Sequence, residues 1–183
     1  MKHIANLLFE MRMLKDIVRS GYAFLGSGRE SIAEHSFTMA FICFVMSKME
    51  GDIDGEKLMA MALLHDIPEA RTGDLNYVQK KYSQVDEAKA ISHLIKPLAF
   101  GKDIKSLIEE FNLGETREAK LAQDADQLSF VLELKKLGDT GAVSPEHWLP
   151  LVIGRIQTRA GRQMAKSIME TQWDEWWTND YSE

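Results

Sequence analysis

Residues Met59–Ala70 read MAMALLHDIPEA, and Thr72-Gly73-Asp74 follows one residue later. The first half of this stretch holds only small and apolar side chains, which predicts a helix that is buried on nearly every side. The run then ends in three ionisable side chains, those of His65, Asp66 and Glu69. Because ionisable groups are rarely buried without a partner, the stretch indicates a site as well as a core helix.

The helical period places these three side chains in one wedge. At about 100° per residue, Asp66 lies about 100° from His65 around the axis, and Glu69 lies about 40° from it. Pro68 removes one helical hydrogen bond, so we expect the helix to kink or end there and to bring Asp74 beside the same wedge. The alternative is an ordinary helix end with solvated polar side chains, where Asp66 and Glu69 would oppose the helix dipole. We therefore expect a cation site.

Length and composition indicate one globular domain. The chain has 183 residues, of which 45% are hydrophobic and 27% charged, and no linker divides it, so we expect a single domain over residues 1–183. The net charge of −6 argues against a nucleic-acid duplex as partner. No apolar run approaches the roughly 18 residues of a membrane span and no signal peptide is present, so we expect a cytoplasmic protein without a membrane partner.

Apolar residues recur at helical spacing along the chain, and no strand pattern or repeat interrupts them. We expect an all-α bundle of about six to eight helices. The first runs from Ile4 to near Gly21, and the second begins near Ile32, after the capping box formed by Ser31 and Glu34. The remaining helices are expected over about 54–70, 83–98, 104–113, 115–137 and 144–169, the last with interruptions at Pro150, Gly154 and Gly161.

Three further features bear on packing. The body of the second helix, Phe37–Met49, is apolar on nearly every side, which predicts a central helix. It contains the single cysteine, Cys43, which we interpret as a buried thiol rather than a nucleophile. In the C-terminal helical segment 144–178, we expect Trp173, Trp176 and Trp177 to pack onto the body or onto a second subunit.

Three of the expected helices carry side chains that could together bind a metal ion. His35 falls in the first turn of the second helix, His65-Asp66 follows in the third, and an Asp lies on the helix over 115–137. Two imidazoles and two carboxylates suit Mn, Co, Fe, Ni or Zn better than Ca or Mg. Helical angle alone slightly favours Asp124 over Asp126 as the fourth ligand. Taken by itself, His35 is better explained as a hydrogen-bonded structural histidine.

Five blocks of the sequence, in order, resemble the HD-domain metal-dependent phosphohydrolases, and in particular their 5'-deoxynucleotidase branch. The blocks are RSGY at 19–22, ESIAEHS at 30–36, HDIPEA at 65–70, Gly73-Asp74, and ADQL at 125–128. They lie between about residues 14 and 137. The resemblance implies an HD-type helical bundle, a nucleotide substrate and a homodimer.

The resemblance also implies a role for each residue of the site. His35, His65, Asp66 and Asp126 would bind one divalent metal ion, and the catalytic residues would be Asp66 and Glu69, the latter acting on the attacking water. The substrate-binding residues follow the same resemblance: Arg19 for the 5'-phosphate, Asp74 for the sugar 3'-hydroxyl, and Tyr22 where the family often has a Trp that helps to exclude the ribose 2'-hydroxyl. From its own stretch of sequence alone, Arg19 is better explained as a cation at the end of the first helix.

The implied reaction is hydrolysis of deoxyribonucleoside 5'-monophosphates to deoxynucleoside and phosphate. Two alternatives remain open from the sequence. The chain could act on another phosphate ester, such as a nucleoside triphosphate, a cyclic dinucleotide or an alarmone, because a fold does not determine a substrate. It could also be a nucleotide-sensing helical protein without catalytic activity.

Overall fold

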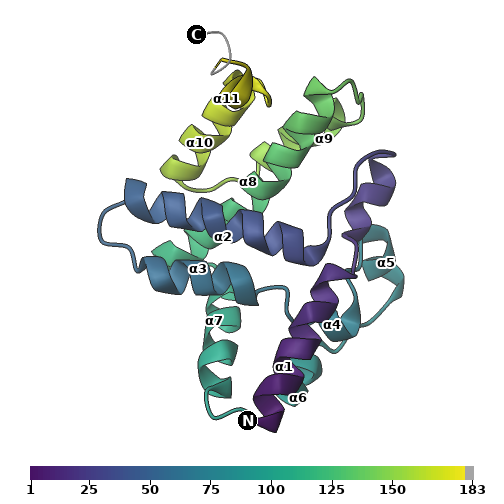
Figure 1. Cartoon of the computed structure of the whole chain (residues 1–183), viewed down its shortest axis with the longest axis vertical. Coiled ribbons are helices and arrows are strands. Elements are labelled where there is room, and N and C mark those ends of the chain that lie inside the picture. Colours follow the sequence, from purple (N-terminus) through teal and green to yellow (C-terminus); the bar gives the residue numbers. More distant parts are fainter. Residues whose placement is uncertain (180–183) are drawn as a thin grey trace.

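The computed structural model describes residues 1–179, and within them the chain is built from α-helices without a strand (Figure 1). Eight helices have nine or more residues and three are shorter, which confirms the all-α class. The helices are α1 (Lys2–Arg12), α2 (Ile32–Met49), α3 (Gly55–Leu64), α4 (Glu69–Thr72), α5 (Tyr77–Tyr82), α6 (Glu87–Ile95), α7 (Gly101–Leu113), α8 (Arg117–Asp139), α9 (Pro145–Ile153), α10 (Arg159–Glu170) and α11 (Glu175–Thr178). Over this part of the chain, no helix has both the length and the apolarity that a membrane crossing requires.

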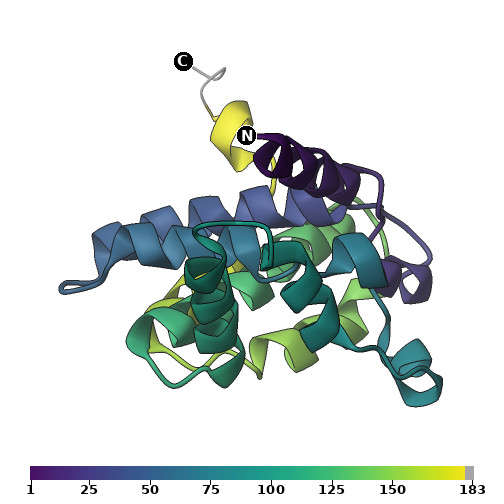
Figure 2. The ribbon, with the colours of Figure 1, turned by 90° about the horizontal axis from the view of Figure 1, so that it is seen from below.

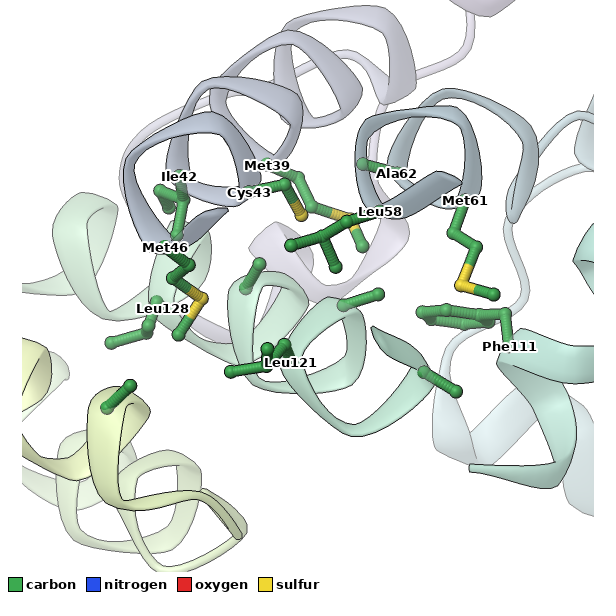
Figure 3. Close-up of a cluster of buried hydrophobic side chains, with 14 of the residues drawn as sticks. Met39, Ile42, Cys43, Met46, Leu58, Met61, Ala62, Phe111, Leu121 and Leu128 are labelled. Carbon is green, nitrogen blue, oxygen red and sulfur yellow. The ribbon is translucent and has the colours of Figure 1, made fainter. Parts of the chain in front are cut away.

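Helices α2, α3 and α8 form the centre of the bundle, where α2 packs against both of the others. Their facing side chains build the main core, shown in Figure 3. Its fully buried members include Met39, Met46, Leu58, Met61 and Leu128. Helix α2 therefore packs against two core helices, as expected of a central helix, but it is not buried on nearly every side, because one stripe of the helix stays exposed to solvent. In Figure 2, α2 lies along the surface of the bundle rather than inside it.

The chain breaks after α3, as the proline predicts. Helix α3 begins after Asp54, whose side chain accepts a hydrogen bond from the Lys57 amide at 2.9 Å. It ends at Leu64, and the chain turns through residues 65–68 before α4 begins. Pro68 lies at the start of α4, where its missing amide hydrogen costs nothing. His65 and Asp66 therefore lie at a broken helix end, with side chains free to meet other helices.

Gly73 directs the chain after α4 back toward the N-terminal segment. Its φ is +71°, in the left-handed region that glycine adopts without steric cost. The turn brings Asp74 to Ser20, whose backbone amide donates to Asp74 Oδ2 at 2.6 Å. Two segments more than fifty residues apart in sequence thus meet beside the broken end of α3.

The first helix is shorter than expected. Helix α1 ends at Arg12, a 3₁₀ turn continues to Lys15, and the chain is then extended. The extended segment pairs with the residues before α2: the Ile32 amide donates to the Ile17 carbonyl at 3.0 Å, and the Arg19 amide donates to the Glu30 carbonyl at 2.9 Å. These two hydrogen bonds join the segment to residues before α2 and take the place of helical hydrogen bonds. They outweigh the apolar periodicity that predicted a helix as far as Gly21.

Other boundaries differ from expectation by a few residues. Helix α6 begins at Glu87 rather than near Ser83, because Asp86 caps it by accepting from the Lys89 amide at 2.9 Å. Pro150 lies inside α9 and Gly161 lies inside α10, so only residues 154–158 interrupt the helical sequence between Pro145 and Glu170. The helices predicted over 104–113 and 115–137 are confirmed within three residues at each end.

Candidate active site

The structure brings the four residues predicted to bind metal to one place. His35 comes from the first turn of α2, His65 and Asp66 follow α3, and Asp126 lies in the middle of α8. His35, His65 and Asp126 each offer one ligand atom, and these three atoms lie within 4.8 Å of one another. Asp66 adds a fourth ligand atom, with its Oδ2 at 3.0 Å from His65 Nε2 and 3.8 Å from His35 Nε2.

His65 directs a lone pair toward this cluster. Its Nδ1 lies 2.9 Å from the Ala62 carbonyl oxygen, which can only accept, so Nδ1 carries the proton. A neutral ring would then hold an unprotonated Nε2 against Asp66 Oδ2. Burial by itself would lower the pKa of His65, but the charge and hydrogen bond of Asp66, together with Asp126, raise the pKa above its ordinary value. The site thus favours a positive charge on Nε2, which a proton or a metal ion can supply.

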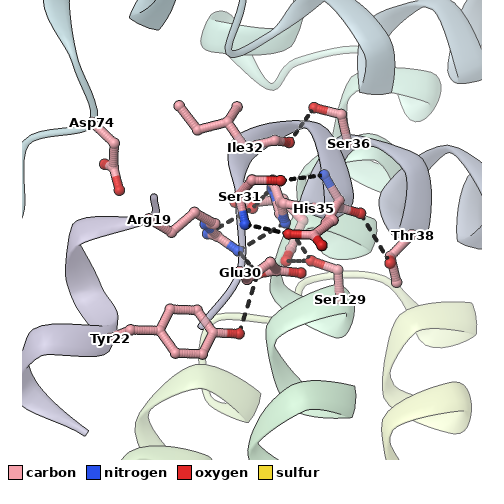
Figure 4. Close-up of polar contacts among 12 residues, drawn as sticks. Arg19, Tyr22, Glu30, Ser31, Ile32, His35, Ser36, Thr38, Asp74 and Ser129 are labelled. Carbon is pink, nitrogen blue, oxygen red and sulfur yellow. Dashed lines mark hydrogen bonds and ion pairs between the residues drawn. The ribbon is translucent and has the colours of Figure 1, made fainter. Parts of the chain in front are cut away.

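His35 is fully buried and has one nitrogen without a partner. Its Nε2 lies 3.1 Å from Asp126 Oδ1, yet it makes no hydrogen bond to any residue that the structure describes. Its Nδ1 lies 2.8 Å from Ser129 Oγ and 2.8 Å from Arg19 Nη1, as Figure 4 shows. Ser129 Oγ in turn donates to the Asp126 carbonyl at 2.8 Å. Because buried polar atoms are rarely left unpaired, Nε2 is placed as a ligand would be.

The two aspartates of the cluster carry negative charge at neutral pH. Burial would raise the pKa of Asp66, but the neighbouring His65 and His35 lower it. The pKa of Asp126 is lowered as well, because His35, His65 and Arg19 together outweigh its burial. The cluster therefore concentrates anionic and lone-pair donors around one point.

Asp124, the alternative ligand, lies outside the cluster. It is fully buried and accepts hydrogen bonds from the Gln157 amide at 2.8 Å and from the Thr158 amide and hydroxyl at 2.7 and 2.6 Å. These bonds hold the segment between α9 and α10 against α8. A Cβ on Gly161 would lie 2.4 Å from Asp124 Oδ2, so this glycine allows a close approach rather than ending a helix.

Arg19 lies against the cluster rather than at a helix end. Its Nη1 donates to Glu30 Oε2 at 3.0 Å, and its Nη2 lies 4.0 Å from Asp126 Oδ1. Its guanidinium carbon lies 5.7 Å from the centre of the Phe130 ring. Burial would lower the pKa of Arg19, but Asp126, Glu30 and Asp66 raise it, so the side chain stays charged. The interpretation of Arg19 as a capping cation is wrong, because α1 ends seven residues earlier.

Tyr22 shares a hydrogen-bond acceptor with Arg19. Its ring is 6% exposed, and its hydroxyl donates to Glu30 Oε2 at 3.3 Å, the oxygen that also accepts from Arg19. Burial and the charge of Glu30 raise the pKa of the Tyr22 hydroxyl. Sequence reasoning assigned no role to Glu30 or to Ser129. The position of Ser129, three residues after Asp126 and so on the same helix face, could have identified it; no comparable signal identifies Glu30.

Glu69 and Asp74 line two cavities on either side of the segment around Leu75. Glu69, His65 and Asp66 line a cavity of about 260 Å³. Burial, with the charges of Asp66 and Asp74, raises the pKa of Glu69 to about 9. Asp74 lines a larger cavity of about 600 Å³ together with Arg19 and Tyr22. The residues predicted to act on water and on the sugar thus both face open space beside the cluster.

The donor set fits a divalent cation of the borderline class. Two imidazole nitrogens and two carboxylates suit Mn, Co, Fe, Ni or Zn. The unpaired Nε2 of buried His35 and the Nε2 of His65 facing a carboxylate are both accounted for by one shared cation. The residues present therefore fit a metal ion, and the adjacent Arg19 adds an anion-binding fork.

Comparisons with known proteins find relatives of similar sequence and a solved structure of similar fold. The zebrafish (Danio rerio) 5'-deoxynucleotidase HDDC2 is 28% identical over 137 residues, covering 70% of this chain and 68% of that protein. The Dictyostelium discoideum 5'-deoxynucleotidase HDDC2 is 30% identical over 132 residues, covering 66% of this chain and 70% of that protein. A solved structure of a conserved hypothetical protein from Pyrococcus furiosus is 27% identical and superposes with a TM-score of 0.75, covering 91% of this chain and 99% of that one.

A model of the HD domain matches residues 11–169, most of the chain and all of the site. The match includes the cluster of His35, His65 and Asp126, the Asp66 carboxylate beside the two histidines, and Arg19. This chain therefore belongs to the HD-domain family.

Proposed function

We propose that this protein is a metal-dependent phosphohydrolase, a 5'-deoxynucleotidase that releases phosphate from deoxyribonucleoside 5'-monophosphates. The observation that carries the proposal is the position of Arg19, whose Nη2 lies 4.0 Å from Asp126 Oδ1 at the edge of the cluster. A phosphate group there would meet a guanidinium fork and a metal ion at once. The family match and the relatives named 5'-deoxynucleotidase support the same reaction.

The cluster would hold one divalent ion through His35, His65, Asp66 and Asp126. When bound, such an ion supplies a water molecule of lowered pKa and positive charge for the phosphoryl oxygens. The Ala62 carbonyl fixes the ring of His65 so that Nε2 faces the ion. Ser129 would do the same for His35, by accepting from Nδ1–H.

Arg19 and Ser129 compete for the same nitrogen of His35. A guanidinium only donates, so the contact of Arg19 Nη1 with Nδ1 requires an unprotonated Nδ1 and places the ring proton on Nε2. That tautomer cannot bind a metal through Nε2. Metal binding would therefore select the contact with Ser129 and free Arg19 for the phosphate, while Glu30 keeps the guanidinium nearby.

Glu69 would position and deprotonate the attacking water. Its pKa of about 9 without metal arises from burial and the nearby charges of Asp66 and Asp74. A divalent cation beside it opposes these effects and favours the ionised carboxylate. A base with a pKa close to neutrality is suited to receive a proton from the water and return it to the leaving oxygen.

Asp74 and Tyr22 would select the sugar. Ser20 holds Asp74 Oδ2 through its amide at 2.6 Å and its hydroxyl at 3.2 Å, which leaves Oδ1 for the 3'-hydroxyl of a substrate. The hydroxyl of Tyr22 is held by Glu30, so the residue presents its ring to the cavity. An apolar ring offers no partner to a ribose 2'-hydroxyl, which favours deoxyribose.

The test is phosphate release from the deoxy and ribo forms of each nucleoside monophosphate, with added Mn²⁺ or Co²⁺ and with chelator. We expect metal-dependent release from the deoxy forms and none from the Asp66→Ala variant. Release only from triphosphates, cyclic dinucleotides or alarmones would reassign the substrate. Nucleotide binding without any turnover would indicate a sensor instead.

We also propose that the protein is one domain and that it forms a homodimer through α2. Apart from Met49 at its end, the exposed positions of α2 recur every three or four residues and are Glu34, Phe37, Phe41, Phe44 and Lys48. The three phenylalanines are 71%, 61% and 42% exposed, an apolar stripe that monomers rarely present to water. Antiparallel pairing centred on Phe41 would place Glu34 of one copy beside Lys48 of the other, which supports a second copy as the occupant.

Sedimentation analysis tests this interface. We expect a dimer for the wild-type chain and a monomer for Phe41→Glu, whereas Val143→Glu, an exposed apolar position elsewhere, is the matched control. A wild-type monomer would overturn the proposal. Loss of the dimer in Trp176→Glu but not in Phe41→Glu would move the interface to the C-terminal segment, where Trp176 is 75% exposed.

A further inference from the structure

The cavity of about 600 Å³ beside Arg19 has two chemically different ends. Its polar end is formed by Arg19, Ser20 and Asp74. The rest of the lining includes an aromatic end, where Phe24 comes from the 3₁₀ helix Ser20–Phe24, Tyr77 from α5 and Trp148 from α9. Phe130 of α8 lies between the two groups, because its ring centre is 5.7 Å from the Arg19 guanidinium carbon and 6.5 Å from the Trp148 ring centre. A volume of this size is typical of a pocket for a small organic ligand.

The aromatic end is arranged around Phe24. The ring centre of Phe24 lies 5.2 Å from that of Tyr77 and 6.5 Å from that of Trp148, with the Phe24 and Trp148 planes inclined by only 29°. Phe24 is 39% exposed and Tyr77 is 58% exposed, so neither residue is buried in the core. Rings of this size left open beside a polar site offer flat surfaces for stacking.

We propose that the aromatic end of this cavity binds the nucleobase of the substrate. The inference rests on the proposed function, and it adds residues to which the family resemblance assigns no role. The lining holds one kind of group for each part of a nucleotide: a guanidinium for the phosphate, a carboxylate for the sugar hydroxyl, and aromatic rings for the base. A substrate held by Arg19 and Asp74 would extend its base toward Phe24 and Tyr77.

The same lining predicts little discrimination among bases. Among the described residues, the lining beyond the polar end presents mainly ring faces, and its polar groups are those of Asn76 and Arg155 with the Tyr77 hydroxyl and the Trp148 indole N–H. Each base has a π-face, so stacking is tolerant of base identity, whereas selection requires hydrogen bonds to base edges. The subsite therefore discriminates between a nucleotide and a sugar phosphate rather than between one base and another.

The test compares deoxynucleoside monophosphates with methyl 2-deoxyribofuranoside 5-phosphate, which keeps the sugar and phosphate and lacks the base. We expect the wild-type kcat/KM to be about 5- to 150-fold higher for the nucleotides, the range that base stacking on an aromatic side chain supplies. Phe24→Leu and Tyr77→Leu should lower kcat/KM for every nucleotide and leave the value for the base-free ester unchanged. Tyr82→Leu is the matched control, because Tyr82 is on α5 with Tyr77, is 87% exposed and does not line the cavity.

Two results would overturn the subsite: equal wild-type kcat/KM for nucleotide and base-free ester, or variants that impair both substrates alike. Failure of the proposed function looks different, since no ester would then release phosphate. In that case, calorimetric binding of dAMP to the wild-type protein decides the matter. Binding weakened by Tyr77→Leu but not by Tyr82→Leu supports the subsite, and the absence of binding refutes it.

Discussion

Removing the hydroxyl of Ser129 tests how the protein prepares His35 for a metal ion. Ser129 is fully buried, and its Oγ lies 2.8 Å from His35 Nδ1. In Ser129→Ala, a metal bound at Nε2 would leave Nδ1–H buried without an acceptor. A buried donor without a partner costs about 1–3 kcal/mol. Since about 1.4 kcal/mol corresponds to a tenfold change in affinity, we expect metal affinity to fall by roughly 5- to 150-fold, in line with other residues that orient metal ligands.

The assay is competition between the protein and a chelator of known affinity, with Mn²⁺, Co²⁺ and Zn²⁺ in turn. Ser36→Ala is the matched control, because Ser36 lies next to His35 and is buried, but its hydroxyl donates only to the Ile32 carbonyl at 2.9 Å within its own helix. We expect Ser36→Ala to leave metal affinity unchanged. The reasoning would be refuted if Ser129→Ala bound metal as tightly as the wild-type protein while Asp126→Ala clearly lost metal affinity.

Further predictions follow from other contacts. Arg19→Ala should lower kcat/KM for monophosphates while metal affinity is retained, and an unchanged kcat/KM would remove Arg19 from the phosphate site. Glu69→Gln should keep the metal and lower kcat. Without metal it should also raise Tm at pH 7 but not near pH 4, because an unfolded Glu ionises near 4.5 whereas the folded carboxyl stays neutral to about 9. The cost to folding therefore grows as the pH rises from 4.5 to about 9 and stays at its maximum above that. Asp124→Ala should destabilise the fold by about 2–4 kcal/mol in urea titrations by orphaning two backbone amides, with little effect on metal affinity. Burial raises the pKa of Cys43 to about 12, so iodoacetamide should label it at pH 8 only after unfolding.

The local features were predictable because their causes are local in the chain. The capping box at the start of α2 is two side chains closing on neighbouring amides, with Ser31 Oγ accepting from the Glu34 amide at 3.2 Å. The break after α3 follows from the geometry of Pro68 alone. The predicted end of the first helix was wrong for the opposite reason: the cause is not local. The segment after α1 is extended because hydrogen bonds hold it to residues before α2.

The amino-acid sequence alone determined the helical class and the core helices, since periodicity, caps and residue type act over a few residues. The resemblance of five sequence blocks to a known family supplied the site residues, whose roles stay a prediction. Only the tertiary structure decided how these groups face one another. Asp124 and Asp126 both lie at the edges of the apolar stripe of α8, so the helical wheel alone barely separates them as ligands. In the structure, one accepts from the amides before α10 and the other lies 3.1 Å from His35. The tertiary structure also decided the contact of Ser129 with His35 and the aromatic end of the cavity. Both depend on residues brought together from different elements, and no sequence pattern within one segment predicts such contacts.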